Sequence, residues 1–335
     1  MPPSPPSSAP SPSASITRGH LLTEQVNPHS CDLDQLSALD IVDVFNREDA
    51  RVIDAIAQAR VPLAAAIDAI AAALRQGGRL IYVGAGTSGR LGVLDAAECP
   101  PTFCTPPEMV QAIIAGGAEA LVRSSEALED RAEDGAQAVG DRQVSAQDVV
   151  VGITAGGTTP YVHGALAAAR QRGATTVFIA CVPTDQVSAE VDIDIRLLVG
   201  PEVLAGSTRL KAGTATKLAL NILSTGAMVK LGKVYGNRMV DVAVTNTKLL
   251  DRALRMLEDL THLSRDAAAM LLQQSQQRVK LALLLHWTGL DAVAGDRLLA
   301  AHQGNLRQAV AAHQPPSANR TEEECGRFDQ FSSRQ

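Results

Sequence analysis

Two glycine-rich loops contain the residue types that proteins use to hold a phosphate group. The first reads Gly84-Ala-Gly-Thr-Ser-Gly-Arg90 and lies between the apolar run 79–83 and helical sequence. Glycine lets backbone N–H groups approach an anion closely, and the N-terminus of a following helix attracts negative charge. Two hydroxyl side chains inside the loop suit a terminal phosphate monoester. The candidate phosphate-binding residues here are Gly86, Thr87, Ser88 and Gly89.

The same residues also match the G-x-G-x-x-G pattern of dinucleotide-binding folds. A dinucleotide-binding loop is therefore an alternative to a loop that binds a phosphate monoester. Such folds place an acidic residue for the ribose about 20 residues further on. The segment 109–117, where it belongs, contains no acid, and the next one is Glu119. A bridging pyrophosphate is therefore less favoured than a monoester. A plain strand–helix turn without a ligand is the other alternative.

A second loop of this kind, Thr154-Ala-Gly-Gly-Thr-Thr-Pro160, follows the apolar run 149–153. Pro160 fits the first turn of a helix. Because the carboxyl ends of parallel strands meet at one edge of a sheet, both loops are expected to converge on one crevice. The candidate binding residues of this loop are Gly156, Gly157, Thr158 and Thr159.

A third segment, Gly206-Ser-Thr-Arg-Leu-Lys211, places two hydroxyls and two cations at the start of a long helix predicted for 207–231. Ser207 can cap that helix. Lys211, ahead of Arg209, is a candidate substrate contact. The simpler interpretation is a capped helix whose charges are solvated.

Short apolar runs alternate with Ala-rich segments of helical period along the middle of the chain. The runs predict strands at 79–83, 149–153, 176–180 and 193–199, with a weaker one at 109–114. This order predicts an α/β fold, a doubly wound parallel sheet flanked by helices. After Thr245 strand signals vanish, and a small all-helical domain is expected. Helices are predicted at 52–74, 124–139, 161–172, 207–231, 251–260, 265–287 and 291–302.

Composition narrows the class of protein further. Apolar residues make up 46% of the 335 residues, enough for a sizeable core and about two domains. The 30 Lys and Arg against 36 Asp and Glu give a net charge of −6, which argues against a nucleic-acid binder. We expect a disordered Pro/Ser leader at 1–20, an α/β domain with N-terminal helices at 21–245, a helical domain at 246–312 and a polar tail at 313–335.

The five cysteines lack the spacing of a metal site or a redox pair, and we expect reduced thiols. No apolar run approaches the roughly 20 residues of a membrane span. The N-terminus lacks the basic start and apolar stretch of a secretory signal. The sequence therefore predicts a cytoplasmic protein that binds neither nucleic acid nor membrane.

Three longer segments of the chain are GRLIYVGAGTSGRLGVLDAAECPPT (78–102), GPEVLAGSTRLKAGTATKLALN (200–221) and GKVYGNRMVD (232–241). Together they resemble the sugar-isomerase (SIS) fold, and specifically the N-acetylmuramic acid 6-phosphate etherase family. The segment 200–221 is also the pattern of the glucokinase-regulatory-protein group. The lead-in LTEQVNP (22–28) is similar to the start of the family. The resemblance spans roughly Leu21 to Val310.

The resemblance implies a homodimer that shares active sites between subunits and binds a small sugar phosphate. The family cleaves the lactyl ether of N-acetylmuramic acid 6-phosphate, giving N-acetylglucosamine 6-phosphate and D-lactate. No metal and no organic cofactor is implied. Proton transfer at C2 and at the leaving oxygen needs one or two carboxyl groups and no nucleophile.

Two glutamates match the catalytic positions of the family. Glu98 precedes Cys99-Pro-Pro101, and we expect the prolines to end a helix there and to hold the carboxylate near the first loop. Glu129 shares helical spacing with Glu126 and Glu133. Taken alone, Glu98 fits an exposed helix end and Glu129 a solvated acidic face. Which glutamate is acid and which is base stays open.

The chain departs from the family at the second loop. Relatives usually carry Ser where this sequence has Gly156 and Arg where it has Thr158. We expect weaker or rearranged phosphate binding. His163, on the following helix, is expected to serve packing or the surface. Two other functions remain: a sugar-phosphate regulator without catalysis, and an aldose–ketose phosphate isomerase on the same fold.

Overall fold

The computed structural model describes residues 18–123, 128–242, 244 and 246–313 of the chain. These residues form two compact units. The first comprises 18–100 and 105–227, and the second comprises 101–104 and the residues from 228 onward. The predicted leader and tail lie almost wholly outside the described residues.

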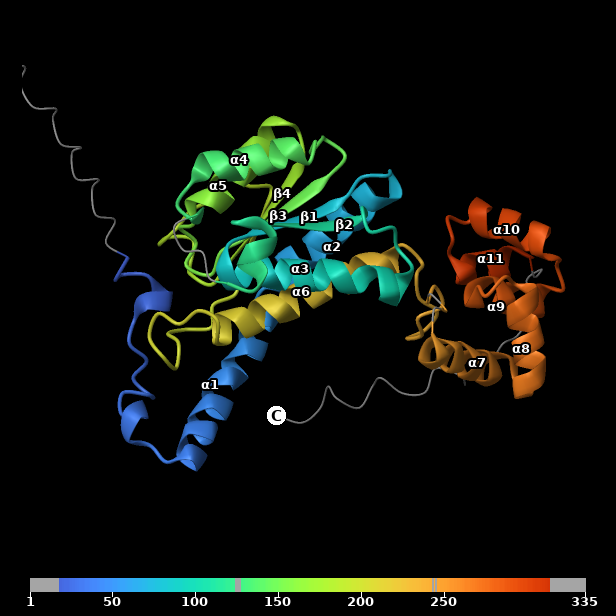
Figure 1. Cartoon of the computed structure of the whole chain (residues 1–335), viewed down its shortest axis with the longest axis horizontal. Coiled ribbons are helices and arrows are strands. Elements are labelled where there is room, and N and C mark those ends of the chain that lie inside the picture. Colours follow the sequence, from blue (N-terminus) through green and yellow to red (C-terminus); the bar gives the residue numbers. More distant parts are fainter. Residues whose placement is uncertain (1–17, 124–127, 243, 245, 314–335) are drawn as a thin grey trace, which may run out of the picture. The chain divides into compact units, whose positions relative to one another are not determined.

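A five-stranded parallel sheet forms the centre of the first unit (Figure 1). Its strands are β1 (Leu80–Gly84), β2 (Val110–Ile114), β3 (Val149–Ile153), β4 (Thr175–Ala180) and β5 (Ile193–Arg196). The spatial order is β2-β1-β3-β4-β5, and every neighbouring pair is parallel. All five predicted strands are present, including the weaker one at 109–114, but the one predicted at 193–199 ends at Arg196. The order reverses at β1, so the topological switch point lies between β1 and β3.

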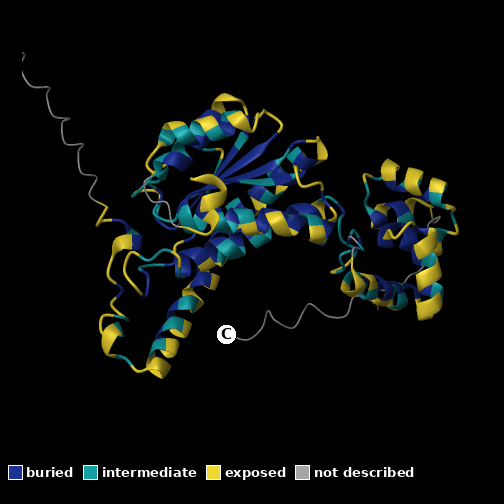
Figure 2. Cartoon of the chain, viewed as in Figure 1, coloured by how far each residue is buried: buried dark blue, intermediate teal, exposed yellow. Residues whose placement is uncertain are grey.

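Helices cover both faces of the sheet, as the doubly wound prediction requires. Figure 1 shows α4 (Ala132–Asp141) and α5 (Pro160–Gln171) on one face. On the other face lie α2 (Arg60–Arg75), α3 (Gly86–Phe103) and α6 (Lys211–Lys230). The central strands are buried on both faces (Figure 2). This burial explains why they read as continuous apolar runs.

A buried carboxylate fixes how β1, α3 and α6 pack together. The hydroxyl of Tyr82 on β1 donates a 2.8 Å hydrogen bond to Asp95 of α3. Ser224 of α6 donates to the other oxygen of Asp95 at 3.2 Å. Burial raises the pKa of Asp95, although both hydroxyl donors oppose that shift. The contact therefore fixes the position of α3, whose first turn contains Thr87 and Ser88 of the first glycine loop.

The N-terminal part of the unit contains one more helix than predicted. The sequence predicts a single helix at 52–74, but the structure has α1 (Ala38–Gln58) and α2, bent by 60° at Ala59. Pro62 has no N–H to donate and belongs in a first turn, so α2 has to start near it. Two short 3₁₀ turns, Leu22–Glu24 and Leu33–Gln35, precede α1. Among described helices none alone is long and apolar enough to span a membrane, although the bent α1–α2 pair passes that test jointly.

Two further helix predictions are wrong at their ends. Helix α3 does not stop before Pro100 but continues through both prolines to Phe103. The prolines remove two N–H donors, and the buried Cys99 and Phe103 side chains hold the last turn nonetheless. Helix α4 begins at Ala132 instead of 124, because Arg131 has an extended backbone. Residues 124–127, including Glu126, lie outside the described residues.

The second unit is all-helical, as predicted. It contains α7 (Thr247–Thr261), α8 (Arg265–Gln274), α9 (Val279–Thr288), α10 (Ala292–Ala301) and α11 (Leu306–His313). The predicted helix 265–287 is broken at Gln276 and Gln277, which adopt positive φ without any glycine or proline to signal it. Val240 and Val242 pack into this core, ahead of the predicted domain start at 246. The core is closed by residues from every helix of the unit.

Helices α4 and α5 approach so closely that glycine is required where they cross. A Cβ on Gly164 of α5 would collide with the carbonyl oxygen of Ala132, and one on Gly135 of α4 with that of Tyr161. Since backbone atoms cannot swing aside, Gly164→Ala should lower the free energy of unfolding by about 2 kcal/mol or more. Denaturant titration measures this.

Gly140→Ala is the matched control, because its Cβ would meet only the flexible tip of Arg172, at 3.1 Å. We expect no loss there, since alanine favours helix. Equal stability of the two variants would contradict the close crossing.

Candidate active site

Both glycine loops open onto one cavity of about 230 Å³ at the carboxyl ends of β1 and β3. The predicted convergence on one crevice is therefore confirmed, and it lies at the switch point of the sheet. Six of the ten predicted binding residues line the cavity. They are Gly86, Thr87, Ser88, Gly156, Thr158 and Thr159.

The first loop is tighter than the sequence suggests, because α3 already begins at Gly86. Thr87 and Ser88 therefore lie in the first turn of α3, where the backbone N–H groups have no helical partner. Gly86 has φ +52°, a conformation that favours glycine. Gly89 serves packing instead, since a Cβ there would lie 2.6 Å from Ile114 and 2.8 Å from the Gly84 carbonyl. This turn presents donors to the cavity and negative charge is favoured there.

The second loop is held by its own hydrogen bonds. The hydroxyls of Thr154 and Thr159 lie 2.8 Å apart, and the N–H of Gly157 donates to the carbonyl of Thr154. Gly157 has φ +76° and does not line the cavity. Its carbonyl lies 2.6 Å from Nε2 of His163, so this histidine supports the loop rather than merely covering the helix surface. Thr154, Thr158 and Thr159 are the residues of this loop with hydroxyl side chains that line the cavity.

The position of Gly156, where the family usually has Ser, is open. A Cβ on Gly156 would have one neighbour within 4 Å, the Thr23 hydroxyl at 3.7 Å. Thr23 is fully buried, and its hydroxyl has no hydrogen-bond partner among the described atoms. A buried hydroxyl without a partner costs about 1–3 kcal/mol.

The two predicted catalytic glutamates lie at different places. Glu129 lines the cavity from a turn, and its carbonyl accepts a hydrogen bond from the N–H of Tyr161 at 3.0 Å. It does not share a helix face with Glu133, because α4 starts later than predicted. Glu98 is exposed on α3, seven residues beyond Leu91, the last α3 residue at the cavity. Seven helical residues span about 10 Å, so the structure does not bring Glu98 to the cavity of its own chain.

The third predicted segment is arranged differently from the expectation. Ser207 lies in a turn and does not cap α6, which starts at Lys211. The cap is supplied by the buried carboxylate of Glu202, which accepts from the N–H groups of Lys211 at 3.0 Å and Ala212 at 2.9 Å. Burial raises the pKa of Glu202, and the two backbone donors act against that rise.

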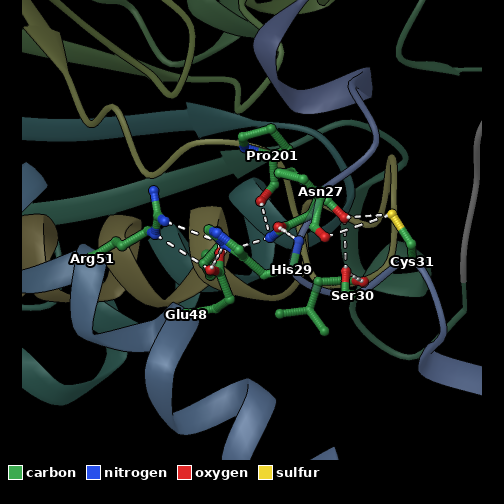
Figure 3. Close-up of polar contacts among 10 residues, drawn as sticks. Asn27, His29, Ser30, Cys31, Glu48, Arg51 and Pro201 are labelled. Carbon is green, nitrogen blue, oxygen red and sulfur yellow. Dashed lines mark hydrogen bonds and ion pairs between the residues drawn. The ribbon is translucent and has the colours of Figure 1, made fainter. Parts of the chain in front are cut away.

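Lys211 is fully buried and does not line the cavity. Its ammonium lies 2.7 Å from Oε2 of Glu48 on α1, and Glu48 is itself 1% exposed. Figure 3 shows the other groups around Glu48: Asn27 donates at 2.7 Å, Nδ1 of His29 lies at 2.8 Å, and Arg51 lies at 3.4 Å. Lys211 therefore has a structural partner, whereas the sequence predicted a substrate contact.

These partners set the ionisation of Glu48. Burial by itself raises the pKa of a carboxyl group, because the charged form loses water. Hydrogen bonds from Lys211, Asn27 and His29, with the charge of Lys211, outweigh that effect and lower the pKa of Glu48 to about 2. Glu48 thus stays charged at the junction of α1, α6 and the N-terminal segment.

The cavity also has walls that the sequence analysis did not single out. The N-terminal segment contributes Arg18, Leu21 and Glu24. The turn before α6 contributes Thr208, and α6 itself contributes Gly213 and Thr216. Glu24 lies in the segment 22–28, which resembles the start of the family, so the sequence contained a signal for this residue. Nothing in the sequence indicated Arg18. Among the residues the structure describes, no three His, Cys, Asp or Glu side chains lie close enough to share a metal ion.

Comparison with known proteins agrees with this architecture. Residues 62–170 match the N-terminal SIS domain of glucokinase regulatory protein, 132–225 match the SIS domain, and 236–285 match the C-terminal lid domain of glucokinase regulatory protein. A relative from Trichormus variabilis named N-acetylmuramic acid 6-phosphate etherase is 74% identical over 296 residues, 88% of this chain and 96% of the relative. One of the same name from Microcystis aeruginosa is 69% identical over 297 residues, 89% of this chain and 97% of the relative.

The chain belongs to the N-acetylmuramic acid 6-phosphate etherase family. The SIS-type sheet with a helical C-terminal region is the architecture expected from that resemblance.

The low pKa of Glu48 makes the first unit sensitive to acid. A carboxyl group with a folded pKa of about 2 and an unfolded value of 4.5 stabilises the fold above pH 4.5, and this contribution is lost as pH falls toward 2. We expect wild type to exceed Glu48→Gln in free energy of unfolding by about 3 kcal/mol at neutral pH. The gap should close between pH 4.5 and 2, measured by denaturant titration at each pH.

Glu108→Gln, which alters an exposed carboxylate, is the control and should track wild type at every pH. A gap between wild type and Glu48→Gln that stays constant down to pH 2 would show that Glu48 is not held charged in the native state.

Proposed function

We propose that the chain cleaves the D-lactyl ether of N-acetylmuramic acid 6-phosphate to N-acetylglucosamine 6-phosphate and D-lactate, in the recycling of cell-wall sugars. The observation that carries this proposal is the 69–74% identity to relatives of that name, over almost their whole length. The cavity with two anion-binding loops supports a phosphorylated substrate. The cytoplasmic location stays a prediction.

The reaction needs proton transfers more than a strong nucleophile. In the open-chain sugar the C1 aldehyde acidifies the C2 proton, and a carboxylate removes it. The C3–O bond then breaks, and its electron pair leaves with the lactate oxygen, which a carboxylic acid protonates. Water adds at C3 and a proton returns to C2. Two carboxyl groups therefore suffice for the whole sequence.

The residues around the cavity are suited to two different tasks, phosphate binding and proton transfer. The first turn of α3 and the second loop offer N–H groups and hydroxyls for the phosphate. Glu129 lines the same cavity and is suited to act on the bound sugar. The second carboxyl group, Glu98, is exposed about 10 Å along α3 from the cavity of its own chain.

We therefore propose a homodimer in which Glu98 of one subunit completes the cavity of the other. Glu98 is an exposed carboxylate that does not line the cavity of its own chain, which supports this arrangement. In a two-fold symmetric dimer each contact between subunits occurs twice, so both cavities would be completed in the same way. Each active site would then hold Glu129 from one chain and Glu98 from the other.

The main rival is a sugar-phosphate regulator without catalysis, because two of the matching family models describe glucokinase regulatory protein. Incubating the purified chain with N-acetylmuramic acid 6-phosphate and measuring D-lactate separates the two. An etherase releases one D-lactate for each sugar consumed. A regulator, or an aldose–ketose isomerase, releases none.

Removing either carboxyl group should abolish most of the turnover. We expect Glu98→Gln and Glu129→Gln each to lower kcat by about 10²-fold or more, the range for losing a general acid or base. Glu133→Gln, an exposed neighbour of Glu129 on α4, is the matched control and should keep full activity. Near-native turnover of Glu98→Gln would remove Glu98 from the mechanism.

A mixing experiment tests whether the site is shared. Glu98→Gln and Glu129→Gln chains are unfolded together in equal amounts and refolded, so that half of the dimers combine the two variants. Each mixed dimer holds one intact site out of two, and about a quarter of the wild-type activity should return. Either variant refolded alone should stay inactive. Activity that fails to return in the mixture, or a monomeric mass with full activity, contradicts a shared site.

A further inference from the structure

The N-terminal segment forms one wall of the cavity and is firmly anchored. Leu21 is 1% exposed in the core of the first unit, and its N–H donates to the carbonyl of Arg18 at 2.9 Å. The amide side chain of Gln186 accepts from the N–H of Leu22 at 2.9 Å and donates to the carbonyl of His20 at 3.2 Å. The backbone that carries Arg18 is therefore fixed beside the cavity.

Arg18 differs from every other described residue of the cavity lining in being a cation. The other lining residues are neutral, apart from the carboxylates Glu24 and Glu129. Lys211 is buried elsewhere in its pair with Glu48. The cavity thus has many neutral donors and a single guanidinium among the residues described.

The substrate of the proposed function carries two anionic groups, a phosphate on C6 and a carboxylate on the lactyl ether at C3. Backbone N–H groups and hydroxyls at a helix N-terminus suit the phosphate. A planar guanidinium is the group that binds a carboxylate with two parallel hydrogen bonds. The charges of the cavity therefore match both ends of this substrate.

The position of Arg18 favours the carboxylate over the phosphate. Its guanidinium lies 3.7 Å from Asp130, the residue next to Glu129, on the side of the cavity where proton transfer is proposed. The lactyl carboxylate is one carbon from the ether oxygen that is cleaved, so its partner has to lie near the proton-transfer group. Both Arg18 and Asp130 are largely exposed, at 43% and 64%, and such a pair is weak enough to exchange for a substrate carboxylate.

We propose that Arg18 binds the lactyl carboxylate of the substrate and so distinguishes the muramic ether from sugar phosphates that lack it. The proposal rests on the proposed function. Arg18 keeps the lactyl group beside Glu129 while the C3–O bond breaks, and it takes no part in proton transfer. It is a specificity residue.

The test compares two ligands that share the phosphate but differ in the carboxylate. For Arg18→Gln we expect kcat/KM for N-acetylmuramic acid 6-phosphate to fall by about 10–100-fold, the effect of one charge-assisted pair. The inhibition constant of N-acetylglucosamine 6-phosphate, which has no lactyl group, should change by less than about twofold. Arg18→Lys keeps the charge without the planar fork and should recover part of the loss.

Arg131→Gln is the matched control, because Arg131 is a nearby exposed arginine that does not line the cavity, and it should match wild type. If the inhibition constant of N-acetylglucosamine 6-phosphate rises in parallel with the loss of kcat/KM, Arg18 binds the phosphate and the proposal is wrong. If neither quantity changes, Arg18 does not touch the substrate, and the proposal is equally wrong. Failure of wild type to release D-lactate would instead count against the proposed function itself.

Discussion

The buried ion pair between Glu48 and Lys211 is the contact on which the cavity depends. It joins α1 to the first residue of α6, two elements separated by more than half of the first unit in sequence. Asn27 donates to the same carboxylate at 2.7 Å and to the carbonyl of Pro201 at 3.1 Å, and Ser30 donates to the carbonyl of Val203 at 2.7 Å. The N-terminal segment and the residues before α6 are thereby fastened to each other, and both supply walls of the cavity. The buried carboxylate of Glu48 is tolerated because Asn27, His29 and Arg51 contact it in addition to Lys211.

The sheet and the convergence of the loops could be predicted from the sequence, because the information is local. Buried parallel strands are continuous apolar runs, and glycine with hydroxyls at a strand end marks an anion site whatever follows. The switch point between β1 and β3 then brings the two loops together without any knowledge of side-chain packing. The resemblance to the family then indicated which glutamates are candidates for catalysis.

What could not be predicted depends on tertiary contacts. Lys211 has the charge of a substrate contact, and only the approach of Glu48 from 163 residues away makes it structural. Ser207 has the chemistry of a cap, but Glu202 reaches the same N–H groups. The acidic spacing around Glu129 indicates a helix, yet the extended backbone of Arg131 ends the pattern there. In each case the local sequence favours one structure or role, and the folded structure, which the spacing of residues does not reveal, gives another.

The complete burial of Lys211 also gives the molecule an internal reporter. Amine-reactive reagents attack an uncharged amine that solvent can reach, and the ammonium of Lys211 is neither accessible nor free of its carboxylate partner. Lysine-modification mapping of the native chain should therefore spare Lys211 while labelling exposed lysines such as Lys230. Appearance of a labelled Lys211 peptide would show that the contact between α1 and α6 has opened.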